Sequence, residues 1–438
     1  MSAPETARAD ICIIGAGSSG MTVAKALKAR GLAYDCFEKG SDIGGMWRYQ
    51  NDNGLSSAYA SLHIDTSRDN LGYSDFPIPP DKPDFLSHAE FLRHLEAYAD
   101  RFGLREGVQF RTSVTAVEPA AEGRWTVRTD TGIDRTYRAV VIANGHLWDP
   151  RLPDFPGSFA GTQIHSHHYR TAAPFEDKDV LVVGLGNSAV DIAVDLCRRA
   201  RSVTISTRRG AWIMPKYLMG IPVDRWSGFL SRKLRLPTTV TRSIMSRLIR
   251  LAVGDQRRFG LKRPDHPMWR EHATLSQELL PYIGHGWITV KPDVALLDRQ
   301  VVIFRDGSRQ RFDAIIHATG YRTTFPFLST EIFDGERRPV RLFRRILPPE
   351  RPGLFFAGLV QPIGPTIPLV ETQAVWIAGV LAGTVRVPGK ADMEREIDAH
   401  AADQRSTYVD AERYALEVDY RRYSHALKAD IAAGTAGR

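Results

Sequence analysis

Short apolar runs along the chain alternate with stretches in which apolar residues recur at helical spacing. An apolar run at Asp10–Ile14 precedes the glycine-rich residues 15–20, and an amphipathic stretch then leads to Gly31 and a second apolar run at Tyr34–Glu38. This order is typical of a strand, a helix and a second, parallel strand. The N-terminal segment therefore predicts a βαβ unit.

The same order recurs further along the chain. Asp179–Val183 is an apolar run, an apolar helix follows it over residues 190–196, and a strand is expected at Ser202–Ser206. Buried strands at Val140–Ala143, Ala314–His317 and Leu354–Ala357 and a helix at Glu371–Leu381 complete the outline. Such a series predicts an α/β protein with parallel sheets.

The turn after the first strand has the residues of a phosphate cradle. It consists of Gly15, Ala16, Gly17, Ser18, Ser19 and Gly20, and Glu38 ends the next strand. Gly15 makes the tight turn, Gly17 lets backbone N–H groups approach a pyrophosphate, and Gly20 lets the helix pack on the strand. The helix N-terminus stabilises the anion, and Glu38 would bind ribose hydroxyls. This unit is expected to hold FAD or NAD.

A second glycine-rich turn follows the strand at Asp179–Val183, but basic residues stand where Glu38 stands in the first unit. It consists of Gly184, Leu185, Gly186, Asn187, Ser188 and Ala189, with Val190 and Asp191 next on the helix. Arg208 and Arg209 stand near the end of the following strand, where an acidic residue would select NAD. Arginine binds a 2′-phosphate by charge-assisted hydrogen bonds, so this unit predicts NADPH. Two such units indicate electron transfer from a nicotinamide to a flavin.

These assignments predict two Rossmann-like domains, the NADPH domain inserted into the FAD domain. The expected parts are residues 1–155 (FAD domain, first part), 172–322 (NADPH domain, with a basic helical insert at 212–270) and 323–438 (FAD domain, C-terminal part). Within the insert, apolar residues at helical spacing predict a helix whose buried face contains Val240, Ile244, Leu248, Leu251 and Ala252.

The excess of basic residues is concentrated in one segment of the chain. The 438 residues include 58 basic and 50 acidic residues, and the segment 208–270 alone holds 15 basic and three acidic ones. No nucleic-acid-binding motif accompanies this charge, so a solvated face or attraction for an anionic cofactor is favoured over nucleic acid. Peripheral contact with an anionic membrane through the insert is a sharper alternative.

The cysteines and histidines exclude other chemistry. Three scattered cysteines form no CxxC pair, which excludes a dithiol redox centre and favours a reducing, cytoplasmic location. His165, His167 and His168 have no further ligand at matching spacing, so no metal is expected. No apolar run is long enough to predict a membrane span.

The stretch Phe159–Tyr169 fits the pattern FxGxxxHxxxY. It resembles the signature of flavin-containing monooxygenases, class B flavoproteins that carry FAD and use NADPH and O2. Other similar stretches are Gly44–Trp47, Tyr59–Leu62, Tyr73–Pro77, Ser206–Gly210 and Ala318–Tyr321. The resemblance covers nearly the whole chain. It implies that His165 and Tyr169 are structural or hinge residues between the domains.

The resemblance also implies which residues surround the flavin ring and the nicotinamide. They are Gly45, Met46, Trp47, Ile64, Asp65, Thr66, Thr319, Gly320 and Gln373. The family usually has asparagine where this chain has Asp65, and an ionised aspartate can only accept hydrogen bonds. Asp65 therefore has a raised pKa, or acts as a catalytic base, or leaves the missing donor to a neighbour such as Asn70.

The activity implied is oxygenation of a small-molecule substrate with NADPH and O2. The family forms a C4a-hydroperoxyflavin that oxygenates a soft nucleophile, an amine nitrogen or a sulfide sulfur. Baeyer–Villiger oxygenation of a ketone is the nearest alternative, which Asp65 favours and Tyr169 disfavours. An uncoupled NADPH oxidase that releases hydrogen peroxide and a non-catalytic NADPH-sensing flavoprotein are the others. A homodimer is common in the family.

Overall fold

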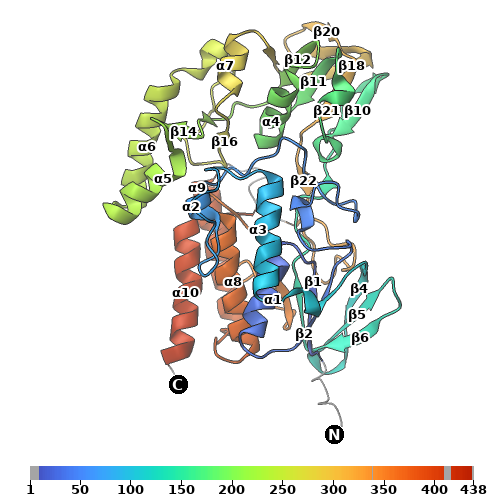
Figure 1. Cartoon of the computed structure of the whole chain (residues 1–438), viewed down its shortest axis with the longest axis vertical. Coiled ribbons are helices and arrows are strands. Elements are labelled where there is room, and N and C mark those ends of the chain that lie inside the picture. The colour runs from blue at the N-terminus through green and yellow to red at the C-terminus, as the bar shows by residue number, and fades with distance from the viewer. Residues whose placement is uncertain (1–8, 338, 409–415, 437–438) are drawn as a thin grey trace.

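The computed structural model describes residues 9–337, 339–408 and 416–436. Its long axis joins two lobes, each built around a parallel sheet, with both termini at the same end (Figure 1). Among the helices in these ranges, none combines the length and apolar character that crossing a bilayer requires.

The lower lobe in Figure 1 is organised by a five-stranded parallel sheet in the order β23-β7-β1-β2-β3. Its strands are β1 (Ile11–Ile14), β2 (Tyr34–Phe37), β3 (Val108–Gln109), β7 (Ala139–Ile142) and β23 (Leu354–Phe356). Strands β1, β7 and β23 are buried along their whole length because helices or sheets cover both faces. One face packs on helices α1 (Ser18–Lys28), α3 (His88–Arg101), α8 (Thr366–Leu381) and α10 (Tyr420–Ala436).

The other face of this sheet meets a three-stranded antiparallel sheet. Its strands are β4 (Val114–Pro119), β5 (Trp125–Thr129) and β6 (Asp134–Tyr137). Alternate residues of β1 therefore enter different cores: Ile11 and Ile13 pack with the helices, whereas Cys12 and Ile14 pack with Trp125. Helix α3 begins with a capping box in which Ser87 and Glu90 satisfy each other's backbone N–H groups. Helix α9 (Lys390–Thr407) completes the lobe.

The upper lobe repeats this plan with the order β10-β21-β11-β12-β17. Its strands are β10 (Thr162–His165), β11 (Asp179–Val183), β12 (Ser202–Ser206), β17 (Ile288–Lys291) and β21 (Ala314–His317). Helices α4 (Asn187–Leu196) and α7 (Leu279–Gly284) cover one face. A small sheet covers the other with β9 (Gly157–Phe159), β18 (Val294–Arg299), β19 (Val301–Phe304) and β20 (Arg309–Arg311).

The chain passes between the lobes at two places that lie side by side. Strand β8 (Asp149–Pro150) leads into the upper lobe, and β22 (Tyr321–Arg322) leads out of it; the two pair antiparallel. Arg322 forms an ion pair with Asp149 at 2.9 Å, and Thr324 donates to the same carboxylate at 2.9 Å. Because of this pairing, the carboxyl ends of the strands in both sheets face the same space between the lobes.

One predicted boundary differs from the structure. The upper sheet begins with β10, and β9 pairs with β18 of the same lobe, so the second domain starts near residue 157 rather than at 172. The stretch that contains His165 thus lies inside this domain, not between the two. The short, weakly patterned strands of 157–165 become recognisable only through their partners, which lie more than 130 residues away. Helix α8 also starts earlier than expected, directly after Pro365.

The basic insert forms a wing beside the upper lobe (Figure 1). It contains β13 (Ile213–Met214), the hairpin β14 (Tyr217–Leu218) and β15 (Ile221–Pro222), α5 (Val223–Gly228), a π-helical turn (Phe229–Lys233) and α6 (Thr238–Val253). Helix α6 buries Thr241, Met245 and Ile249. The predicted buried face holds in part: Ile244 and Leu248 pack against the apolar core of the insert, whereas Val240 and Leu251 are exposed, at 42% and 84%.

Three basic residues of the insert form ion pairs with carboxylates of the FAD domain. Lys216 pairs with Asp65 at 3.0 Å, and Arg225 pairs with Asp69 at 2.7 Å. The bonds continue from Arg225 to Asp84 at 2.6 Å and from Arg242 to Asp419 at 2.9 Å. The insert therefore belongs to the NADPH domain by sequence but docks on the FAD domain, and part of its charge has an intramolecular partner.

Candidate active site

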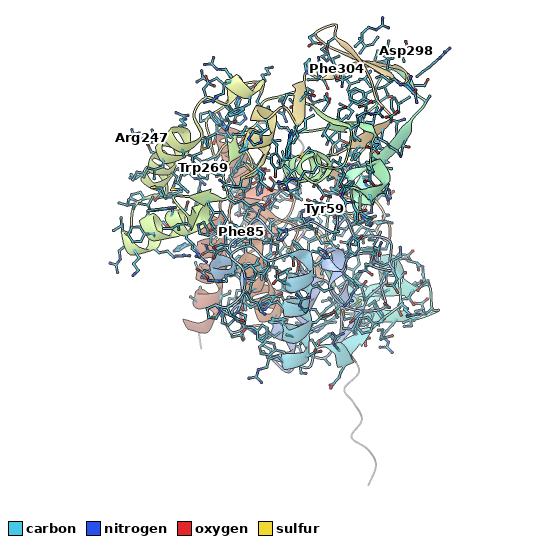
Figure 2. All side chains as sticks on the ribbon, turned by 45° about the horizontal axis from the view of Figure 1, so that its top comes forward. Tyr59, Phe85, Arg247, Trp269, Asp298 and Phe304 are labelled. Atoms are coloured by element: carbon cyan, nitrogen blue, oxygen red, sulfur yellow. The ribbon has the colours of Figure 1, made fainter. Side chains whose placement is uncertain are left out.

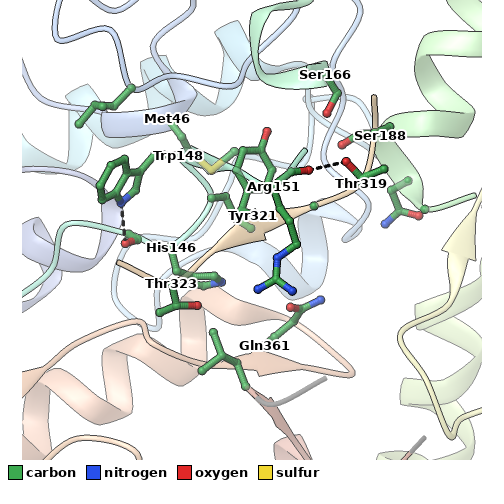
Figure 3. A pocket seen from close by; sticks show the side chains of 18 of the residues that line it. Met46, His146, Trp148, Arg151, Ser166, Ser188, Thr319, Tyr321, Thr323 and Gln361 are labelled. Atoms are coloured by element: carbon green, nitrogen blue, oxygen red, sulfur yellow. Dashed lines mark hydrogen bonds between the residues drawn. The ribbon is translucent and has the colours of Figure 1, made fainter. Parts of the chain in front are cut away.

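Both glycine-rich turns open on one cleft of 1610 Å³ between the lobes. Its wall includes both turns, the strand ends that follow them and the crossover segments at 144–156 and 318–327. Figure 3 shows Tyr321 and Arg151 projecting from the crossover, with Met46 and Trp148 on one side and Ser188 on the other. A single cavity thus joins the two predicted dinucleotide sites.

The first turn brings backbone against backbone. Gly15 has φ +99°, and a Cβ there would lie 2.8 Å from the carbonyl oxygen of Ala143. A Cβ on Gly20 would lie 1.9 Å from the carbonyl oxygen of Gly15, so only glycine fits. Gly17 is the N-cap of α1 and accepts no side-chain capping bond, which leaves the first N–H groups of the helix directed at the cleft.

Glu38 is positioned at the end of β2 by backbone donors. Its carboxylate accepts hydrogen bonds from the N–H groups of Ala16 at 2.8 Å and Gly40 at 2.7 Å, and from the Asn53 amide at 3.2 Å. The side chain is 4% exposed and lines the cleft. A fixed acceptor at this strand end fits the ribose hydroxyls of an adenine dinucleotide.

The second turn repeats the geometry of the first. Gly184 has φ +129°, and a Cβ there would lie 2.5 Å from the carbonyl oxygen of Ala318. Gly186 is the N-cap of α4, again without a side-chain bond. The place of Gly20 is taken by Ala189, whose Cβ lies at an ordinary distance of 3.5 Å from the position of a Gly184 Cβ. Ala189 is fully buried, so this turn holds a Cβ where the first turn holds none.

Arg208 and Arg209 follow β12 at the rim of the same cleft. Within the described ranges, no carboxylate forms an ion pair with either guanidinium, in contrast to Arg225 and Arg242 of the insert. The glycine cradles, Glu38 and the two arginines together fit FAD in the first unit and NADPH in the second. FAD accepts hydride from NADPH and activates O2, while the protein provides binding and orientation.

The wall between the two cradles is mainly apolar. Met46, Trp47, Ile64, Leu71 and Phe91 line it, together with Gly45 and Thr66. Gly45 lies against Gly17, since a Cβ on Gly45 would approach the Gly17 Cα to 3.2 Å. Trp47 packs edge-on against Phe91, with ring centroids 4.9 Å apart. Such a wall excludes water. The reduction and oxygenation of a flavin require this exclusion.

Asp65 has a partner that the sequence did not predict. Lys216 of the insert reaches it at 3.0 Å between Nζ and Oδ1, and the same ammonium group lies 5.5 Å from the centre of the Phe85 ring. The side chains of Asp65 and Lys216 are only 24% and 17% exposed. Burial raises the pKa of Asp65, while Lys216 and His63 lower it; the net shift is upward.

Asn70 does not supply the missing donor. Its amide donates to Asp224 at 3.1 Å, and its oxygen accepts from Arg232 at 3.2 Å. It is therefore engaged with the insert and lies outside the cleft wall. Its closeness to Asp65 in sequence was misleading, because the short helix α2 (Arg68–Leu71) turns it away.

A second carboxylate stands beside the pair. Asp191 of α4 accepts a hydrogen bond of 2.9 Å from Tyr59, whose side chain is 3% exposed. Burial and the negative charge of Asp65 raise the pKa of Asp191 to about 7, and the Glu278 charge adds to this, whereas Lys216 and the Tyr59 hydrogen bond lower it. The site thus joins the FAD domain, the NADPH domain and the insert.

Several predicted site residues support the cleft without lining it. They are Ala16, Gly20, Ala189, Val190, Asp191 and Gln373. Gln373 is fully buried; its oxygen accepts from the Gly358 N–H at 2.9 Å and its amide donates to Tyr423 at 2.7 Å. Gln373 therefore lies behind the cleft wall, because both ends of its amide are used to hold α8 and α10 to the strand end. Its role at the flavin stays a prediction.

His165 and Tyr169 are structural, as their burial indicates. Tyr169 donates to Asp195 at 2.5 Å and packs edge-on against Tyr59. The His165 ring accepts from the His167 N–H at 3.0 Å, and burial lowers the pKa of His165 to about 4. A neutral, buried imidazole holds the turn. In the described part of the chain, no group of three or more His, Cys, Asp or Glu side chains could hold a metal ion.

Comparison with known proteins agrees with this geometry. The sequence profile of the family described as flavin-binding monooxygenase-like matches residues 8–435. The chain belongs to this family. It is 35% identical to flavin-containing monooxygenase 5 of Rattus norvegicus, covering 94% of this chain and 81% of the relative. It is 34% identical to dimethylaniline monooxygenase [N-oxide-forming] 2 of the same species, covering 97% and 82%.

Solved structures share the fold. The S-allyl-L-cysteine S-oxygenase of Allium sativum superposes with a TM-score of 0.71 at 27% identity, over 96% of this chain and 88% of that one. An open structure of cyclohexanone monooxygenase gives 0.72 at 18% identity, over 97% and 98%, a likeness of fold alone. This monooxygenase uses FAD, NADPH and O2, and its residues bind, orient and shield the cofactors.

Arg208 tests the coenzyme assignment. Replacing it in Arg208→Ala should raise the KM for NADPH by about one to two decades and leave NADH kinetics almost unchanged, because only NADPH carries the 2′-phosphate. Steady-state kinetics with both coenzymes measure this. Arg247→Ala, on the exposed face of α6, is the matched control and should change neither KM. Equal losses with NADPH and NADH in Arg208→Ala would contradict the assignment.

Asp191 gives the site a pH signature. Because its pKa rises from about 3.9 in the unfolded chain to about 7, the folded state binds the extra proton, and stability falls as pH rises between those values. The Asp191→Asn variant has no carboxyl group at this position, so its stability does not fall with pH for this reason. The Tm of Asp191→Asn relative to the parent should therefore increase from about pH 5 to about pH 7 and stay level above. Parallel Tm curves would show that Asp191 does not titrate in this range.

Proposed function

We propose that this monooxygenase oxygenates a soft nucleophile, an amine nitrogen or a sulfide sulfur, of a small molecule. The observation that carries the proposal is the single cleft, which joins both cradles through an apolar wall. Transfer of oxygen to a soft nucleophile needs a shielded cofactor and no acid–base triad. The relatives above 30% identity include an N-oxide-forming enzyme, and an S-oxygenase shares the fold.

Ketone oxygenation is a second candidate, which one observation favours. Asp65 occupies the usual asparagine position and carries a lysine partner. A Baeyer–Villiger reaction needs an anionic oxygen to attack the carbonyl, and Asp65, which lines the cleft, is a carboxylate placed to take up the proton as that anion forms. The ketone-oxidising structures are below 20% identity and support the fold only.

Product analysis distinguishes these candidates. The FAD-loaded enzyme is given NADPH and O2 with dimethylaniline, with methyl phenyl sulfide or with cyclohexanone, and products, NADPH and hydrogen peroxide are measured together. We expect N-oxide and sulfoxide, with most of the NADPH consumed recovered as product. A lactone from the ketone alone would favour the second candidate. Hydrogen peroxide equal to NADPH, with no product, would show an oxidase and contradict both.

We also propose that the enzyme is cytoplasmic and that its insert contacts an anionic membrane surface. Seven of the eleven large hydrophobic side chains exposed in the described ranges lie between residues 217 and 251. Those beyond the hairpin are Phe229, Leu234, Val240 and Leu251. Exposed Arg232, Lys233, Arg235 and Arg247 accompany them, and Arg247 lies at the outer edge of the wing (Figure 2). Apolar and basic groups together suit anionic lipid.

Vesicle sedimentation tests this contact. The enzyme should sediment with vesicles that contain phosphatidylserine and much less with pure phosphatidylcholine. Leu234→Ser with Leu251→Ser should weaken binding about tenfold through lost apolar burial. Leu296→Ser, which changes an exposed leucine of β18 in the upper lobe but outside the insert, is the control. Absence of binding to anionic vesicles would refute the membrane contact. A dimer that the double variant dissociates would do so too, since it would assign the surface to a homodimer.

A further inference from the structure

Lys216 belongs to the insert but contacts residues of the FAD domain. It follows β13 in the insert, yet its ammonium group lies between two groups of the FAD domain, the Asp65 carboxylate and the Phe85 ring. Lys216 is absent from the cleft wall, whereas Asp65 lines it. Any effect of Lys216 on bound cofactor therefore passes through Asp65.

The positive charge of Lys216 affects the ionisation of Asp65. A carboxylate that loses most of its water strongly favours the protonated form, unless a positive charge is adjacent. Burial lowers the pKa of Lys216, but the negative charges of Asp65, Asp191 and Glu278 raise it, and the net shift is upward, so the ammonium form persists. Lys216 is the amine nearest to Asp65, while His63 contributes a weaker attraction.

The arrangement has a chemical consequence for the cleft. A neutral aspartic acid can donate a hydrogen bond, whereas the ionised form only accepts. With Lys216 present, Asp65 offers the cleft an acceptor at a fixed position, and NADP⁺ carries amide and hydroxyl donors. Tyr59 and Asp191 form a separate hydrogen bond beside the pair, so they leave the Asp65 oxygens to Lys216 and to the cleft.

We propose that Lys216 is a positioning residue that keeps Asp65 ionised and oriented as an acceptor for NADP⁺, so that docking of the insert completes the nucleotide site. The inference rests on the NADPH-dependent activity but on neither substrate class. The insert thereby contributes to coenzyme binding from outside both dinucleotide cradles. Its closeness to Asp65 is a property of this chain, in which an aspartate replaces the usual asparagine.

The experiment measures NADP⁺ binding to FAD-loaded enzyme across pH, without turnover. In Lys216→Met, Asp65 should take up a proton near neutral pH, so the Kd for NADP⁺ should rise about tenfold relative to the parent, the worth of one charge-assisted hydrogen bond. The ratio should shrink in alkaline buffer, where Asp65 ionises again. Lys216→Arg keeps the charge and should bind like the parent. Lys233→Met, an exposed lysine of the same insert, is the matched control.

A double variant separates charge from packing. In Asp65→Asn with Lys216→Met the carboxylate that lines the cleft is gone, while Asp191, which is bonded to Tyr59 and does not line the cleft, still titrates. The part of the pH dependence of the Kd ratio that Asp65 causes should therefore disappear, and the Kd ratio of the double variant to Asp65→Asn alone should not shrink in alkaline buffer. A Kd for Lys216→Met that matches Lys233→Met, or a loss that is the same at every pH, would overturn the proposal. If Lys216→Met fails to retain FAD, recovery in the double variant supports the proposal. Failure of both would assign Lys216 a packing role and overturn it.

Because no substrate is present, the binding result does not depend on the oxygenation assays. An enzyme that makes no N-oxide, sulfoxide or lactone can still show the pH-dependent Kd ratio. Conversely, a fully coupled monooxygenase with a pH-independent ratio would retain its proposed function and lose this role of Lys216.

Discussion

One backbone contact recurs in both halves of the molecule, and the cleft depends on it. The first glycine of each turn, Gly15 or Gly184, lies against the carbonyl oxygen of the alanine that directly follows a neighbouring strand, Ala143 after β7 or Ala318 after β21. No side chain fits there. The close approach brings each following helix onto its sheet with its free N–H groups directed at the cleft. Cofactor binding is therefore built into the backbone before any polar side chain contributes.

The paired crossovers make two cradles into one site. Strands β8 and β22 hold the lobes so that both carboxyl edges face the same cavity, and the insert ties the lobes together a second time. The insert is held by charge, through Lys216 and Arg225 on the FAD domain and Arg242 near the C-terminus. Exposed ion pairs contribute little to folding stability. The Lys216–Asp65 pair is mostly buried, so its geometry matters more than the number of exposed ion pairs around it.

Short-range patterns predicted much of this well. The strands Asp179–Val183, Ser202–Ser206 and Ala314–His317 have the bounds read from their apolar runs, because strands buried on both faces leave a continuous signal. Glu38 and the two turns could be assigned from spacing, since their chemistry is local. The buried face of helix α6 could be assigned only in part: Ile244 and Leu248 of the predicted face pack on the insert, whereas Val240 and Leu251 meet solvent.

The sequence by itself determined the two dinucleotide units and their order, because each unit rests on residues within one strand–turn–helix segment. It also determined the family, because short motifs similar to the family's recur along nearly the whole chain. Only the tertiary structure decided the partners of Asp65, Asn70 and Gln373. Lys216 lies about 150 residues from Asp65 in the chain, and Tyr423 lies 50 residues from Gln373. Pairing over such separations depends on how the insert and the C-terminal helices pack, and no periodicity or spacing within one segment encodes it.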